Sequence, residues 1–165
     1  MKNKFKILLT TDNHLGYLEK DLVRGQDSFN TFEEILQISA SQNVDFILLG
    51  GDLFHDSNPS KQTYFRLLTL LRKYCFGSRP VAFDCVSEND NLFDFNYLDP
   101  NLNISMPIFG IHGNHDEIGS GNLCCMELLD RAGFVNYFGK QSAVDDLHIK
   151  PLLFRKGSCK LALYV

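Results

Sequence analysis

The chain has 165 residues, about the length of one domain, and is 44% hydrophobic and 22% charged, a composition typical of globular proteins. Sixteen basic and twenty acidic residues give a net charge of −4. This balance excludes a polybasic nucleic-acid arm or a basic membrane helix as the main feature. We expect no signal peptide and no membrane segment, since no apolar run approaches roughly 18 residues. Five cysteines without a CxxC pair favour a reduced, intracellular compartment.

The first half of the chain alternates between short apolar runs and amphipathic segments. Residues 5–9 and 44–49 are apolar runs that end in polar residues, which predicts two buried strands. Residues 29–41 are predicted to form a helix, with Thr31 and Glu34 resembling a capping box. The expected apolar face of this helix consists of Phe29, Phe32, Leu36 and Ala40.

A second helix is predicted to begin at Pro59-Ser60. Its apolar positions are Tyr64, Leu67, Leu68 and Leu71, with Phe65 and Leu70 widening the face. The order strand, helix, strand, helix is typical of an α/β fold, whose crossover connections require a mostly parallel sheet.

The segment 77–105 interrupts this alternation with aromatic and acidic residues. A connection near thirty residues long is well above the usual ~4–6, so we expect it to be either functional or disordered. The pattern then resumes with a strand at 107–111 and a helix capped by Gly133. The apolar positions of that helix are Cys125, Leu128, Leu129 and Ala132. Residues 152–154 and 159–165 are predicted to be two strands joined by a short turn.

Three predicted strands end in potential metal ligands. Asp12 and His14 follow the first strand, Asp52 follows the second after two glycines, and Asn114 and His115 follow the third. The carboxyl ends of parallel strands lie at one edge of a sheet, where ligands bind, so these side chains are expected to converge. Two carboxylates, an imidazole and an amide oxygen suit manganese, iron or zinc better than calcium.

Each motif alone has a simpler interpretation as a turn or a helix cap, and the three together favour a metal site. Three further histidines are left outside that site. His55 is interpreted as lying behind the ligands or at the surface, and His112 as a hydrogen-bonded core residue. His148 is interpreted as structural.

The motifs DxH, GGD and GNHD resemble the first three motifs of the calcineurin-like metallophosphoesterase superfamily. The surrounding stretches VRGQDSFNTFEEIL, VDFILLGGDLFHDSNPS, LLRKYCFGSRPV, NISMPIFGIHGNHD and AGFVNYFG are similar to a narrower group. That group is the eukaryotic meiotic recombination eleven family of double-strand-break repair nucleases. The resemblance implies a β-sandwich flanked by helices with metal ligands at strand ends. It further implies a manganese-dependent DNA exonuclease and endonuclease that acts in the nucleus during repair and meiotic recombination.

The resemblance also implies a role for each site residue. Asp12 and His14 match ligands of a first manganese ion, Asp52 matches the carboxylate that bridges two ions, and Asn114 matches a ligand of the second. His115 matches the catalytic histidine that is not a ligand. Such an imidazole gains and loses protons near neutral pH, which suits transfer to a leaving oxygen.

By this resemblance, residues 1–165 are the N-terminal portion of a nuclease domain, with 77–105 as the insertion typical of eukaryotes. Three further metal ligands, the rest of the sheets, a capping domain and the region that binds an ABC-type ATPase are then expected outside these residues. We therefore expect an incomplete metal site. The implied partners are DNA, the ATPase, a regulatory subunit that engages the insertion, and a second copy of the chain. No membrane partner is expected.

The homodimer is expected to form through the helices near 61–74 and 123–132. Their leucines could equally face the sheet, although the apolar face of the first helix is too wide for one contact. If these helices form an interface, the alternative to a nuclease is a non-catalytic module for dimerisation or partner binding. The insertion 77–105 holds five acidic residues and one basic residue, so the remaining chain has 15 of each and no net charge. The excess acidity thus lies in the segment expected to bind a partner.

Overall fold

The computed structural model describes residues 3–87, 95–116, 123–140 and 149–164. Its helices are α1 (Asp27–Ser41), α2 (Lys61–Cys75) and α3 (Cys125–Arg131), with one 3-10 turn at Asn96–Leu98. Its strands are β1 (Ile7–Thr10), β2 (Phe46–Leu49), β3 (Asp84–Cys85), β4 (Ile108–Gly110), β5 (Asn136–Tyr137), β6 (Leu152–Lys156) and β7 (Cys159–Leu163). None of the described helices is both long enough and apolar enough to cross a membrane.

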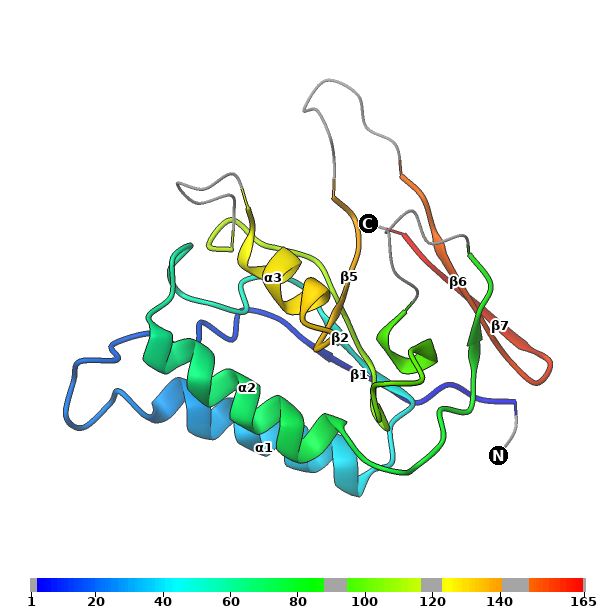
Figure 1. The fold of residues 1–165 in the computed structure, drawn as a ribbon, viewed down its shortest axis with the longest axis horizontal. Helices are drawn as coiled ribbons and strands as arrows, with labels where there is room; N and C mark the ends of the chain where they lie inside the picture. The colour runs from blue at the N-terminus through cyan, green and yellow to red at the C-terminus, as the bar shows by residue number, and fades with distance from the viewer. Residues whose placement is uncertain (1–2, 88–94, 117–122, 141–148, 165) are drawn as a thin grey trace.

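The strands form two sheets of different kinds. β1, β2, β4 and β5 form a parallel sheet in the order β1-β2-β4-β5, with Leu9 paired to Leu48 and Leu48 to Phe109. β3, β6 and β7 form an antiparallel sheet, in which β6 and β7 are the long hairpin at one side of Figure 1. The hairpin confirms the two strands predicted at the end of the chain. Gly157 adopts a φ of 59° at its turn, a left-handed conformation that favours glycine.

The parallel sheet separates two hydrophobic cores, because successive residues of a strand face opposite sides. Ile47 and Leu49 pack with the helices, in a core that includes Phe32, Leu36 and Leu67. Phe46 and Phe109 pack on the other face against the antiparallel sheet. We name this second core the phenylalanine cluster; it comprises Phe46, Phe83, Phe95, Phe109 and Phe154, with Leu152 at its border. The α/β sandwich expected from the sequence is therefore confirmed.

Helix α1 begins earlier than the sequence suggested. It starts at Asp27, its N-cap is Gln26, and the Gln26 side chain makes no capping hydrogen bond. Thr31 lies inside the helix, so the predicted capping box with Glu34 is wrong. The predicted apolar face is right at three positions but not at Ala40, which is exposed while Ser39 is buried. Ser39 can be buried because its hydroxyl donates to the carbonyl of Ile35 at 2.8 Å.

Helix α2 begins as predicted. The Ser60 hydroxyl accepts a hydrogen bond from the Thr63 backbone N–H at 3.1 Å, which satisfies one of the free donors of the first turn. Leu67 and Leu71 are buried in the core next to α1. Phe65, in contrast, is 66% exposed, so the apolar face of α2 is wider than the protein core covers.

The predicted apolar face of helix α3 is right at Cys125 and Leu129 but not at Leu128 and Ala132. Met126 and Leu129 are buried, whereas Leu128 and Ala132 are exposed. Gly133 follows the helix with a φ of 75°, which confirms its predicted capping position. The expectation that Leu128 faces the core is thus wrong, and its side chain remains at the surface.

The described parts of segment 77–105 are packed into the fold. Phe83 and Phe95 are buried in the phenylalanine cluster, and the Cys85 backbone N–H donates to the Tyr97 hydroxyl at 3.1 Å. Arg79 donates to the Val44 and Ser105 carbonyls, at 2.9 and 3.0 Å. A wholly disordered loop is therefore wrong for these parts, because their aromatic residues fill the space between the sheets. The acidic residues Glu88, Asp90 and Asp94 lie outside the described residues, as does His148.

Candidate metal centre

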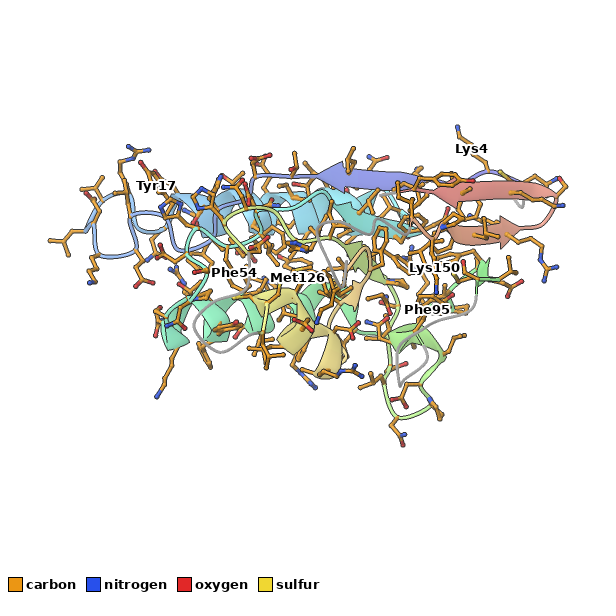
Figure 2. The ribbon with its side chains drawn as sticks, turned by 90° about the horizontal axis from the view of Figure 1, so that it is seen from above. Lys4, Tyr17, Phe54, Phe95, Met126 and Lys150 are labelled. Atoms are coloured by element: carbon orange, nitrogen blue, oxygen red, sulfur yellow. The ribbon has the colours of Figure 1, made fainter. Side chains whose placement is uncertain are left out.

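Three loops meet at the carboxyl edge of the parallel sheet. Residues 11–15 follow β1, residues 50–55 follow β2 and residues 111–116 follow β4; we name them the site loops. Figure 2 shows Tyr17 and Phe54 toward this end of the molecule, and Phe95 toward the other. Backbone hydrogen bonds join the first two loops, because Asp12 N donates to Gly51 O at 3.1 Å and His14 N to Asp52 O at 3.0 Å.

The predicted ligands have an uncommon backbone conformation. Asp12, His14 and Asp52 have φ values of 54°, 44° and 50°, in the left-handed region that non-glycine residues seldom adopt. Such conformations cost about 1–3 kcal/mol each, and they persist where the surrounding structure enforces them, which is often at functional sites. The cross-loop hydrogen bonds provide that enforcement here.

The same three residues bring their side chains together. One ligand atom from each of Asp12, His14 and Asp52 lies within 4.8 Å of the other two. His14 Nδ1 is buried and has no hydrogen-bonding partner among the described residues. Two carboxylates and an imidazole form a set of oxygen and nitrogen donors that fits a divalent transition metal ion. The residues present therefore fit a divalent metal ion.

Asp52 is held in place by the third site loop. The His115 backbone N–H donates to Asp52 Oδ1 at 2.8 Å, and the Asp52 residue is only 9% exposed. A Cβ atom at Gly113 would lie 2.2 Å from Asp52 Oδ1 and 2.6 Å from Asp52 N, so only glycine fits at this position. The absence of a side chain at Gly113 thus makes room for the Asp52 carboxylate.

Asp116 fastens two of the site loops and was not identified from the sequence. It is fully buried, and its carboxylate accepts backbone N–H bonds from Leu53 at 2.9 Å, Phe54 at 2.8 Å and Gly113 at 3.2 Å. Burial raises the pKa of Asp116, and these three hydrogen bonds oppose that rise. Asp116 thus fixes the relative position of the loops that carry Asp52 and Asn114. The sequence feature that could have identified Asp116 was its place at the end of the GNHD motif.

His115 and His55 lie together in the site. His115 Nδ1 is 2.6 Å from the carbonyl oxygen of His55, and the two rings stack with centroids 5.2 Å apart. A carbonyl only accepts, so Nδ1 carries the proton and Nε2 is the basic nitrogen of His115. The His55 ring also contacts His14 and Tyr17. Of the two interpretations of His55, the structure favours a place behind the predicted ligands over the surface, because the turn after Asp52 folds His55 back toward His14.

The remaining predicted residues are placed as follows. Asn114 is exposed on the third site loop, directly before His115. His112 lies in the same loop, and its Nδ1 is 2.7 Å from the Tyr137 hydroxyl, which confirms a hydrogen-bonded histidine. Burial raises the pKa of Tyr137, so this hydroxyl stays protonated.

Comparison with known proteins defines the class. The calcineurin-like phosphoesterase family matches residues 5–158, nearly the whole chain, and the chain belongs to this family of metallophosphoesterases. The family resemblance carried by the three motifs is therefore confirmed.

The similarity extends to particular members of the family. The double-strand break repair protein MRE11 of Mus musculus is 54% identical over 170 aligned residues, which cover 99% of this chain and 24% of the relative. MRE11 of Homo sapiens is 53% identical with the same coverage. The double-strand break repair protein mus-23 of Neurospora crassa is 46% identical, over 96% of this chain and 22% of the relative. The chain thus spans about a quarter of the length of these curated relatives.

Proposed function

We propose that the chain carries part of the metal site of a manganese-dependent DNA nuclease that repairs double-strand breaks. The observation that carries this proposal is the convergence of Asp12, His14 and Asp52 at the carboxyl edge of the parallel sheet. The similarity to MRE11 proteins supports DNA as the substrate. The proposal covers exonuclease and endonuclease action, meiotic recombination and a nuclear location.

Asp12, His14, Asp52 and Asn114 would hold two manganese ions. When bound, such ions neutralise a phosphodiester and activate water as the nucleophile. Asp52 already accepts a hydrogen bond through Oδ1, so its second oxygen remains available as a donor to an ion. Asp116 keeps the loops of Asp52 and Asn114 at a constant separation, which preserves the arrangement of the ligands.

His115 is proposed as the catalytic acid. The hydrogen bond from Nδ1 to the His55 carbonyl orients the ring and leaves Nε2 to deliver a proton to the leaving oxygen. The His115 backbone N–H is bonded to Asp52, so delivery of the proton needs no movement of the third site loop.

The test is cleavage of single-stranded DNA in the presence of Mn²⁺, by the purified chain and by a longer protein that adds the rest of the proposed nuclease domain. Because the ligand set of the chain is incomplete, we expect cleavage by the longer protein, abolished by a chelator and reduced by about 10²–10⁴-fold in His115→Asn, the usual contribution of a general acid. His112→Asn is the matched control, because His112 lies three residues away and bonds to Tyr137. Full activity in His115→Asn would contradict the assignment of His115 as the acid.

The assembly of the chain is a further part of the proposal. We propose that the segment 77–105 engages a regulatory subunit and that an ABC-type ATPase joins the complex through regions outside these residues. Residues 1–165 then correspond to the N-terminal portion of the nuclease domain. The coverage of about a quarter of each relative supports this placement.

A second candidate function is a non-catalytic dimerisation module. Three large apolar side chains are exposed on and beside α2 and α3, since Phe65, Leu123 and Leu128 are 66%, 53% and 48% exposed. Exposed apolar residues gathered on two helices are typical of an interface between copies. Sedimentation of the chain as a dimer that dissociates in Phe65→Glu, with no DNA cleavage, would favour this candidate over the nuclease.

A further inference from the structure

Three imidazoles gather beside the candidate metal centre, one from each site loop. The ring centroids of His14 and His115 are 4.8 Å apart, those of His55 and His115 5.2 Å, and those of His14 and His55 5.4 Å. One ring nitrogen from each histidine lies within 4.8 Å of the other two. Unlike the set of Asp12, His14 and Asp52, this group offers nitrogen donors alone.

The spacing of the rings matches a tetrahedral zinc site. Zinc binds a histidine nitrogen at about 2.0–2.1 Å, and the ring centre lies about 1 Å beyond that nitrogen. Rings at three corners of a tetrahedron then have centres about 5 Å apart. The observed separations of 4.8–5.4 Å agree with this value, so small side-chain rotations suffice to bring the nitrogens onto one ion.

The hydrogen bonding of these rings is incomplete. The Nδ1 atoms of His14 and His55 are buried and have no hydrogen-bonding partner among the described residues. His115 donates through Nδ1 to a carbonyl, which leaves its Nε2 lone pair directed elsewhere. His112 is different, because its Nδ1 pairs with the Tyr137 hydroxyl. Buried polar atoms normally have partners, so a cluster without them indicates a ligand.

We propose that His14, His55 and His115 bind one zinc ion, with a fourth position open to water or an anion. Imidazole donors favour zinc over manganese, since the affinity of nitrogen sites for divalent ions is lowest at manganese and higher at zinc. Zinc bound here excludes manganese from the ligand set of Asp12, His14 and Asp52, because both sites require His14. The proposal of a zinc site depends only on the three imidazoles. The exclusion of manganese by zinc depends in addition on the proposed function.

The test is a zinc titration of the metal-free chain in competition with a zinc-binding dye. We expect one zinc ion per chain and a loss of affinity of at least about 100-fold in His55→Ala and His55→Asn. Two substitutions are used so that a folding defect in one of them, checked by circular dichroism, leaves the other informative. His112→Ala is the matched histidine control, and its affinity should stay within about threefold of the parent chain.

Asp52→Asn separates the two sites. It should retain zinc affinity and lose manganese affinity, measured from the electron paramagnetic resonance signal of free Mn²⁺. Zinc affinity that is unchanged in both His55 variants, or reduced as much by Asp52→Asn as by them, would overturn the proposal. Equal manganese affinity in the parent chain and in Asp52→Asn would instead count against the proposed function and leave the His55 result decisive for zinc.

Discussion

The site loops and the phenylalanine cluster are stabilised in opposite ways. Edge-to-face and stacked rings fill the cluster, with centroids 5.0 Å apart for Phe109 and Phe154 and 5.2 Å for Phe46 and Phe154. The site loops carry strained residues and buried polar groups, connected by hydrogen bonds such as those of Asp116. Packing therefore provides stability on one side of the molecule. On the other side, hydrogen bonding holds side chains in positions that packing alone would not favour.

This contrast assigns different consequences to substitutions in the two regions. Removing a ring from the cluster should lower the free energy of unfolding without altering the site directly. Removing a predicted metal ligand from the site loops should alter metal binding with little loss of stability. Four predictions test this separation.

The largest effect is expected for Phe154→Ala. Phe154 is 1% exposed, and truncation of a buried phenylalanine lowers the free energy of unfolding by about 3–5 kcal/mol. Leu153→Ala is the control, since Leu153 directly precedes Phe154 in β6, faces the other side and is 39% exposed. Leu153→Ala should lower the free energy of unfolding, measured in urea, by about 1 kcal/mol or less. Equal losses in the two variants would show that the cluster is not the source of stability.

Asp52→Asn should have the second largest effect, on metal affinity. Removing the charge of a ligand is expected to reduce Mn²⁺ affinity by at least about 100-fold in a direct titration, while urea unfolding changes by about 1 kcal/mol or less. Asp56→Asn is the matched control, because Asp56 is exposed four residues further along. A large loss of stability in Asp52→Asn with unchanged metal affinity would make Asp52 a structural residue.

Gly113→Ala should affect both stability and metal binding, because Gly113 lies directly against the Asp52 carboxylate. The added Cβ would lie 2.2 Å from Asp52 Oδ1, which forces the carboxylate or the loop to move. We expect a loss of about 1–3 kcal/mol in unfolding together with weaker Mn²⁺ binding. A Cβ added at Gly50 would lie no closer than 3.2 Å to its nearest neighbour, Thr11 Cβ, so Gly50→Ala should cost less. The reverse order of the two variants would contradict the role of Gly113.

The smallest effect is expected for Glu127→Gln, outside both regions. Burial raises the pKa of Glu127, but hydrogen bonds from Lys140 and from the Cys124 backbone N–H outweigh it and lower the pKa. A lowered pKa in the folded state contributes stability above the unfolded pKa of about 4.3, and this contribution is lost as pH falls through the folded value. The free energy of unfolding of Glu127→Gln at pH 7 should therefore be lower than that of the parent chain by less than about 1 kcal/mol. The two should not differ at acid pH. A difference that grows on acidification would contradict this.

The sequence determined the local features of the protein. Alternating and helical hydrophobic patterns predicted the strands and helices, because burial of one face is a property of a single element. The three motifs identified Asp12, His14, Asp52 and Asn114, because polar residues directly after buried strands are placed at one sheet edge by the parallel topology. The errors lay at the start of α1 and at Leu128 and Ala132 of α3, where the outcome depends on which residues neighbouring elements cover.

Only the tertiary structure decided how distant residues meet. It turned His55 onto His14 and His115, and it made Asp116 the connection between two site loops. It also placed Phe83 and Phe95 from an unpatterned segment in the phenylalanine cluster. These contacts join residues dozens of positions apart through backbone hydrogen bonds and close packing. The sequence could not predict these contacts, because hydrophobic periodicity reports the environment of one element. The convergence of distant residues depends on the conformation of every loop between the elements that carry them.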